Sequence, residues 1–140
     1  MSFDLERFVA AQGPAYDGVR AELRAGRKTG HWIWFIFPQL AGLGRSEMSQ
    51  FYGIASLDEA RAYLEHPVLG PRLRECVGAI LATSGVTAEQ IFGSLDAMKV
   101  RSSMTLFARA APDEPSFSGV IDRFYAGVAD ERTDAVLRAR

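Results

Sequence analysis

Apolar residues recur at helical spacing through much of this chain, most clearly near its centre. Between residues 69 and 81 the apolar positions follow one another at intervals of one, three or four, which is the spacing of one face of an α-helix. These positions are Leu69, Leu73, Cys76, Val77, Ile80 and Leu81. The pattern predicts an amphipathic helix that packs this face against the core.

The N-terminal pattern predicts two helices with a break between them. Asp4 is a suitable N-cap for a helix over residues 4–12. Gly13-Pro14 follows, and proline favours a break because it lacks the amide hydrogen that a helix interior needs. A second helix is predicted over residues 15–25, with Gly26 as its C-terminal cap.

Capping residues predict further helices toward the C-terminus. The expected starts are Ser46, Ser56 with Glu59 as its capping-box partner, Thr87 with Gln90, Ser94 and Thr133, and residues 117–125 are also expected to be helical. No series of alternating apolar and polar residues indicates a strand, and no long linker divides the chain. The sequence therefore predicts an all-α fold, with one domain over residues 1–140 and about seven or eight helices.

The segment HWIWFIFP, residues 31–38, is apolar on every side, so periodicity does not distinguish a buried helix from a buried strand. Pro38 disfavours helical geometry at Phe37, so the element is expected to end there. A core needs large aromatic side chains, yet it has no general need of the polar residues and glycines that flank this segment. We expect the segment to contribute both to the core and to a binding site.

Composition narrows the class of protein. The chain has 140 residues, enough to bury roughly two-thirds of its unfolded surface in an independent core. Its formal net charge of -1 gives no overall field that would recruit nucleic acid or an acidic membrane. The single Cys76, an N-terminus without the pattern of a signal peptide, and the lack of a membrane-length apolar run predict a cytoplasmic location.

The aromatic segment supplies the first candidate site residues. Trp32 and Trp34 are either core residues or faces that stack on a planar ligand or a cation. His31 is the best acid–base candidate, because the ordinary pKa of histidine lies near ~6.5, although a structural or exposed histidine is the commoner case. His31 and His66 alone make a poor metal site, and neither a metal nor a cofactor is expected.

The glycine-containing loop that follows, residues 42–46, supplies a second group. Arg45 can bind a phosphate or carboxylate through two donors, and Ser46 opens a helix whose free amides favour an anion. Gln39 adds an amide, and Glu47 is a second acid–base candidate. The alternative is an ordinary loop in which Ser46 is only an N-cap and Arg45 is solvated.

A third group lies in residues 96–107, where Lys99, Ser102 and Ser103 are candidates for binding. In one continuous helix, Arg101 lies about 160° around the axis from Lys99, and the two would not both meet one small ligand. If the helix restarts at Ser102 instead, both cations precede its N-terminus and can join an anion site. Solvated surface charges are the alternative to both arrangements.

Four blocks of the sequence resemble a bacterial family of unknown function, DUF1810. They are HWIWFIFPQLAGLGRSEM, IASLDEARAYLEHPVLGPRLREC, IFGSLDAMKVRSSMTLF and VIDRFYAG, and the resemblance runs from about Asp4 to Thr133. It implies a small, mainly helical domain and supplies no established activity. Some members carry the label calpastatin, but an inhibitor of that type is a long, disordered and repetitive chain, unlike this apolar and non-repetitive one.

Two hypotheses of function follow. The first is a pocket between segments 31–46 and 99–103 that binds a small anionic, nucleotide-like ligand through stacking faces and fixed donors. If a reaction occurs there, His31 or Glu47 would act as acid–base, and Arg45 or Lys99 would stabilise charge. The second hypothesis is a non-catalytic protein-interaction module in which segment 31–38 is partly exposed as the contact patch.

Overall fold

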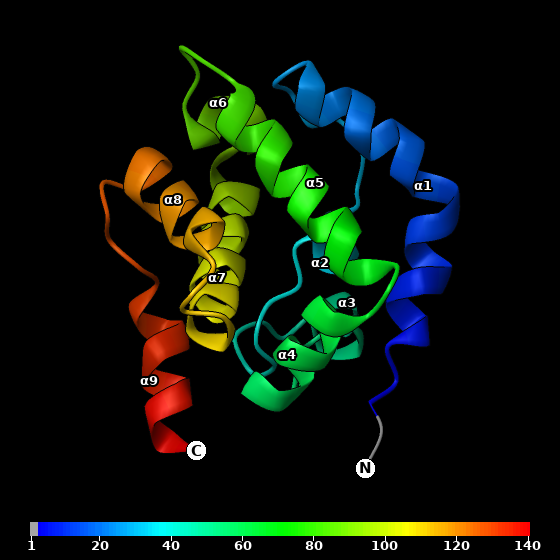
Figure 1. Cartoon of the computed structure of the whole chain (residues 1–140), viewed down its shortest axis with the longest axis vertical. Coiled ribbons are helices and arrows are strands. Elements are labelled where there is room, and N and C mark those ends of the chain that lie inside the picture. Colours follow the sequence, from blue (N-terminus) through cyan, green and yellow to red (C-terminus); the bar gives the residue numbers. More distant parts are fainter. Residues whose placement is uncertain (1–2) are drawn as a thin grey trace.

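Helices make up nearly all of the regular structure in residues 3–140, the part of the chain that the computed structural model describes (Figure 1). In chain order they are α1 (Glu6–Arg24), α2 (Ile33–Ile36), α3 (Glu47–Phe51), α4 (Leu57–Glu65), α5 (Leu69–Ala82), α6 (Ala88–Phe92), α7 (Ser94–Ala110), α8 (Pro115–Phe124) and α9 (Glu131–Ala139). Extended pairing among these residues is limited to an isolated parallel bridge between Leu40 and Ile54. The all-α prediction is therefore confirmed.

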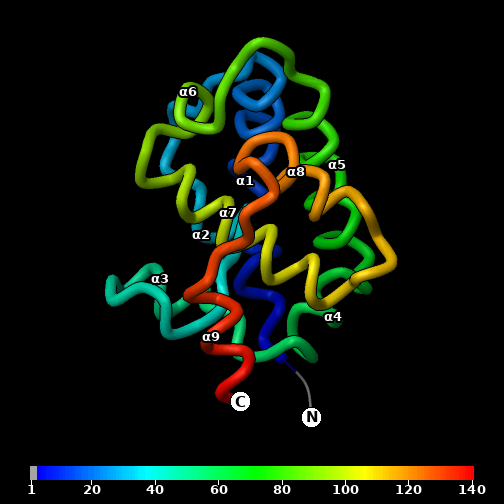
Figure 2. Tube along the Cα trace, turned by 90° about the vertical axis from the view of Figure 1, so that its left-hand side faces the viewer, coloured from blue at the N-terminus to red at the C-terminus, as the bar shows by residue number. Residues whose placement is uncertain are grey.

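Helix α7 forms the centre of the fold. It contacts α2, α4, α6, α8 and α9, and the two views place it in the interior (Figures 1 and 2). Residues 102–108 are all buried, so this part of the helix is covered on every side. A helix buried all round needs apolar or internally bonded side chains on every face. Residues 94–101, by contrast, include exposed positions and are available to line a site.

Helix α5 confirms the clearest prediction from the sequence. Five of its six striped residues are buried, and the sixth, Leu81, packs partly buried against the core. This face packs against α1, α4 and α8. The regular apolar stripe therefore gave the position of this helix to within one residue.

Helix α1 corrects the prediction of two N-terminal helices, because it continues through Gly13-Pro14. Its buried residues form one uninterrupted face along α5: Phe8, Gln12, Tyr16, Val19 and Leu23. Proline in a helix interior costs about 3 kcal/mol, but packing of this long face against α5 outweighs that cost. The predicted end at Gly26 is confirmed, since Gly26 has a φ of 72° and its amide donates to the carbonyl of Leu23.

Replacing Pro14 tests this explanation. Pro14→Ala restores a backbone hydrogen bond within α1 at an exposed position, so we expect the free energy of unfolding to rise by about 1–3 kcal/mol. Urea unfolding followed by circular dichroism measures the change. A decrease in stability would contradict the view that Pro14 is tolerated only because packing offsets its cost. Exposed Ala10→Gly in the same helix is the control, and we expect it to lose about 1 kcal/mol.

The aromatic segment folds as the single turn α2 and ends at Phe37, as predicted. Trp32, Ile33, Ile36 and Phe37 are buried, whereas Trp34 is partly buried. The exposed contact patch of the interaction-module hypothesis is therefore wrong for most of this segment.

Three of the six predicted N-caps, Ser46, Ser56 and Thr87, are confirmed, and the other three are corrected. Ser46 accepts the Ser49 amide, and Thr87 and Gln90 form a complete capping box. Ser56 accepts the Glu59 amide, but the Glu59 carboxylate accepts the amide of Ala55 rather than that of Ser56. The corrected starts are those of α1, where Leu5 and not Asp4 is the N-cap, of α7, which is capped by Gly93 and not Ser94, and of α9, which is capped by Asp130 and not Thr133.

Candidate functional site

Two of the sequence segments named above meet the start of α9 around one cavity of about 190 Å³. We call it the basic cavity. Its lining residues are Gln39, Leu43, Gly44 and Ser49 from the first segment and α3, Leu95, Met98, Lys99, Arg101 and Ser102 from α7, and Asp130 and Arg132 from the start of α9. Figure 2 shows α3 and the preceding loop at the edge of the molecule, beside α9. The site therefore includes a third segment that sequence reasoning did not include.

Lys99 lines this cavity and belongs to a bridge of charged side chains, Lys28–Asp96–Lys99, whose two lysines contact tryptophan rings. The Asp96 carboxylate lies 2.7 Å from Lys28 Nζ and 3.4 Å from Lys99 Nζ, so it joins both lysines. Lys28 Nζ lies 5.1 Å from the centre of the Trp32 ring, and Lys99 Nζ lies 5.0 Å from that of Trp34. These cation–π contacts and the shared carboxylate fix the position of Lys99. Two cations to one carboxylate leave the bridge with net positive charge.

Two arginines complete the cationic lining, and each is anchored to a backbone carbonyl. Arg101 Nε donates to the carbonyl of Val128 at 2.7 Å. Arg132 Nη2 donates to the carbonyl of Leu43 at 2.7 Å, which ties α9 to the loop. Each bond uses one of the five N–H groups of a guanidinium. The anchored side chains thus present further donors without a large loss of side-chain entropy on binding.

The continuous α7 does not separate Lys99 from Arg101 as expected, since both line the basic cavity. Their Cα atoms lie on different sides of the helix, but long side chains can reach around the intervening face. Met98 and Ser102 occupy that face between them and also line the cavity. Lys99 and Arg101 therefore line one cavity although they lie on different sides of a continuous helix.

Asp130 is the acidic residue among the lining residues, and its carboxylate has structural partners. Its Oδ2 accepts from Ser102 Oγ at 3.0 Å, from the Thr133 amide at 3.1 Å and from Thr133 Oγ1 at 2.5 Å. Its own amide donates to Thr105 Oγ1. Asp130 therefore caps α9 and joins it to α7. One carboxylate among three cations leaves the lining with an excess of positive charge.

Trp34 has a free hydrogen-bond donor, and the residue lies next to this cavity. Its indole nitrogen is buried and has no hydrogen-bond partner among the described residues. Trp34 lines a hollow of about 10 Å³ together with Gln39 and Ser49, which also line the basic cavity. A hollow of this size holds about one water molecule or one ligand atom. A buried N–H without a partner costs roughly 1–3 kcal/mol, so an oxygen atom at this position would stabilise the structure.

Several predicted site residues lie away from the basic cavity. His31, Arg45 and Glu47 are exposed, and Ser46 is occupied as the N-cap of α3. Trp32 is buried and donates its indole hydrogen to Glu22. The alternative described for this loop, a capping serine beside a solvated arginine, is therefore what the structure shows. At the start of the short α3, Arg45, Ser46 and Glu47 are exposed, whereas the preceding Gly44 lines the cavity.

Glu22 explains the geometry of the loop before α2. Its Oε1 accepts the amides of Thr29 and Gly30 and the indole of Trp32. Partial burial opposes the charged form, but these hydrogen bonds outweigh it and lower the pKa of Glu22 below the ordinary value. A β-carbon on Gly30 would lie 2.9 Å from the Trp32 ring, so the loop needs glycine there. This loop supports the aromatic core and is not part of the cavity.

The two predicted serines of α7 have different surroundings. Ser102 lines the cavity, and its hydroxyl, which has one hydrogen to donate, lies within hydrogen-bond distance of two acceptors, the Met98 carbonyl and the Asp130 carboxylate. Ser103 is fully buried, and its hydroxyl has no hydrogen-bond partner among residues 3–140. Of the predicted binding residues, Gln39, Lys99 and Ser102 thus line the cavity, and Trp34 adjoins it.

Sequence reasoning missed Arg132, Asp130, Ser49 and the apolar pair Leu95 and Met98. A signal existed for Asp130, because the sequence Asp-Glu-Arg-Thr fits an N-cap followed by an acidic first turn. No local signal marks Arg132, whose partner Leu43 is 89 positions away in the chain.

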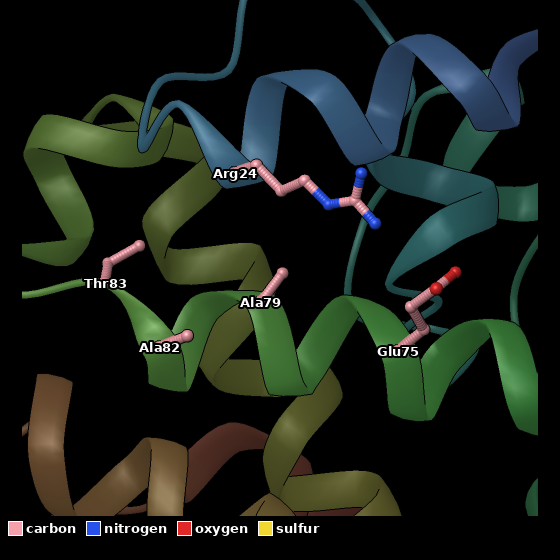
Figure 3. Close-up of a pocket in the computed structure, with 5 residues that line it drawn as sticks. All are labelled: Arg24, Glu75, Ala79, Ala82 and Thr83. Carbon is pink, nitrogen blue, oxygen red and sulfur yellow. The ribbon is translucent and has the colours of Figure 1, made fainter.

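A second hollow, of about 320 Å³, lies between α1 and α5 (Figure 3). It is lined by Arg24, Glu75, Ala79, Ala82 and Thr83. Figure 3 shows short side chains along α5, with Arg24 reaching over them from α1. Its acidic group, Glu75, already accepts the hydroxyl of Tyr16 and pairs with Arg20. The hollow therefore offers few free polar groups, and we regard the basic cavity as the better candidate.

Cys76 follows Glu75 in α5 and is buried in the core. Burial, which outweighs a hydrogen bond with Tyr16, raises the pKa of the thiol to about 12. Because the thiolate is the reactive form, Cys76 is a packing residue rather than a nucleophile.

Among residues 3–140, no group of three or more His, Cys, Asp or Glu side chains is arranged to hold a metal ion. In the same part of the chain, no helix combines the length and the apolar character needed to cross a membrane.

The fold and the cavity define a small, all-helical protein with a cationic site between its central helix and a peripheral loop. The chain belongs to the family described as "Protein of unknown function (DUF1810)", whose sequence model matches residues 2–137. The crystal structure of the conserved hypothetical protein Rv1873 from Mycobacterium tuberculosis is similar, with 54% sequence identity and a TM-score of 0.96 over 97% of each chain. A search of curated proteins found no match.

Proposed function

We propose that this protein binds a small anionic molecule in the basic cavity. The observation that carries the proposal is the convergence of Lys99, Arg101 and Arg132 on one cavity that has a single carboxylate, Asp130, in its lining. Surface cations usually point into solvent, whereas these three come from two helices and are anchored around a common space. Charge-assisted hydrogen bonds to an anion contribute about 1.5–3 kcal/mol each in such a setting.

The size of the cavity restricts the ligand. At about 190 Å³ it is smaller than the roughly 300–1,000 Å³ of pockets that enclose drug-sized ligands. It suits a phosphate or carboxylate group with a small attached body. Gln39 and Ser49 add neutral hydrogen-bonding groups, and Trp34, whose indole N–H has no partner among the described residues, lines a small hollow with them. We place this binding in the cytoplasm, as the single cysteine predicts.

The proposal concerns binding and includes no reaction. The acid–base candidates His31 and Glu47 are exposed and do not line the cavity. The protein-interaction hypothesis has lost its main support, because Trp32, Ile36 and Phe37 are buried. Anion binding is therefore the function that the geometry supports best.

Charge-removing variants test the proposal. We expect Lys99→Gln and Arg132→Gln each to weaken binding of ribose 5-phosphate about tenfold, equivalent to about 1.4 kcal/mol. Isothermal titration calorimetry measures the dissociation constants, and binding should also weaken as salt increases.

Arg138→Gln is the matched control for these variants. Arg138 is on the same helix as Arg132, pairs with exposed Glu131 and does not line the cavity. Its variant is expected to bind normally. Absence of binding by the wild-type protein, or equal losses in the Arg132 and Arg138 variants, would refute the proposed site.

A further inference from the structure

Another cavity, of about 340 Å³ and distinct from the hollow between α1 and α5, adjoins the basic cavity across the ridge that Met98 and Arg101 form. Both residues line both cavities, so the two spaces share a wall. The remaining lining of the larger of these two cavities includes Phe124 and Tyr125 from the end of α8, together with Glu89 and Ser94. We call it the aromatic cavity.

The aromatic cavity has a fixed wall. Tyr125 donates its hydroxyl hydrogen to the carbonyl of Ala97 at 2.6 Å, which holds its ring against α7. The Arg101 guanidinium lies 5.8 Å from the centre of that ring, and that of Arg123 lies 4.9 Å from the centre of the Phe124 ring. Rings held in this way bind a planar group without first losing rotational freedom.

Charge differs between the two cavities. The aromatic cavity has Glu89 in its lining and shares its one cation, Arg101, with the basic cavity. An anionic group is therefore favoured in the basic cavity and disfavoured near Glu89. A ring that carries N–H donors suits the aromatic cavity, because the Glu89 carboxylate and the Ser94 hydroxyl can accept hydrogen bonds.

Beside Arg101, the ridge presents the apolar and exposed side chain of Met98. Met98 is 62% exposed and the neighbouring Leu95 is 74% exposed, although both side chains are large and apolar. They lie one helical turn apart on α7, beside the boundary of the two cavities. A ligand that crosses this ridge would cover apolar surface, and each Å² covered contributes about 25 cal/mol.

We propose that the ligand is a nucleoside monophosphate, with its phosphate in the basic cavity and its base in the aromatic cavity. This inference rests on the proposed function, because it requires the anion site, and it adds the class of ligand. Arg101 contributes to both halves, since it lines the basic cavity and stands beside the Tyr125 ring. The sugar crosses the ridge at Met98.

The test compares three probes by isothermal titration calorimetry: inorganic phosphate, ribose 5-phosphate and adenosine 5′-monophosphate. We expect the monophosphate nucleotide to bind at least tenfold more tightly than ribose 5-phosphate. Ser94→Leu narrows the aromatic cavity at an exposed position and is expected to remove this advantage. Its affinity for ribose 5-phosphate is expected to stay within twofold of the wild-type value.

Ser84→Leu is the matched control, because Ser84 is also exposed but lines neither cavity. It is expected to keep the preference for the nucleotide. Equal binding of the nucleotide and ribose 5-phosphate, or an unchanged preference in Ser94→Leu, would overturn the inference while leaving the anion site intact. If none of the three probes binds, the proposed function fails and this inference fails with it.

Discussion

Arg7→Met is expected to lower the free energy of unfolding by about 3–5 kcal/mol. Arg7 Nη2 lies 3.0 Å from Glu59 Oε2, and the two side chains are only 11% and 4% exposed. Removal of one partner leaves the other charge buried without compensation, which has a cost in this range. Arg7 also donates to the carbonyls of Phe51 and Gly53, so its loss releases the end of the loop that carries the site.

Urea unfolding of two further variants identifies the cause of this loss. Arg138→Met removes an exposed ion pair with Glu131 and is expected to change stability by less than about 1 kcal/mol. Adding Glu59→Gln to Arg7→Met removes the unpaired charge but keeps a group that can accept the Ala55 amide, so part of the stability should return. If Arg7→Met costs no more than Arg138→Met, the buried pair does not stabilise the loop.

Hydrogen bonds from arginine side chains to backbone carbonyls hold both ends of residues 41–53, the site loop, which contributes to the lining of the basic cavity. Arg7 binds it near residue 53 from α1, while Arg132 and Arg140 bind the carbonyls of Leu43 and Ala41 from α9. The loop has few buried apolar side chains between residues 41 and 53, so these contacts replace a core. The shape of the basic cavity therefore depends on α1 and α9 as much as on α7.

The helices that the sequence predicted well are those with a regular apolar stripe or a complete capping motif. The stripe of α5 and the Thr87–Gln90 box of α6 are local properties, and both survive in the fold. The break predicted at Pro14 was also a local argument, but it failed because a long buried face against α5 outweighs the lost hydrogen bond. Local preference is reliable where tertiary packing does not oppose it.

The site was only partly predictable for a related reason. Chemical type alone pointed to Gln39, Lys99 and Ser102, which do line the cavity. It also pointed to Arg45, which is exposed, and it missed Arg132. The direction of a side chain on an irregular loop depends on contacts with distant segments, and a single sequence does not contain those contacts in readable form.

Gly70→Ala is expected to destabilise the protein by about 3 kcal/mol, at the upper end of the cost of overpacking. Gly70 lies at the start of α5, where a β-carbon would stand 2.1 Å from the backbone carbonyl oxygen of Leu64 at the end of α4. It would also stand 2.8 Å from Arg74, which donates to that same carbonyl. Backbone atoms cannot yield as a flexible side chain can, so α4 and α5 must move apart.

Gly78→Ala on the same helix separates this steric effect from helix propensity. A β-carbon on Gly78 has no atom within 4 Å, and the position is exposed. Alanine favours a helix interior by about 1 kcal/mol over glycine, so this variant should be slightly more stable. Thermal and urea unfolding compare the two. If both substitutions stabilise the protein, α4 and α5 do not approach as closely as the structure shows. If Gly70→Ala destabilises the protein while Gly78→Ala stabilises it, the close contact at position 70 requires a residue without a β-carbon.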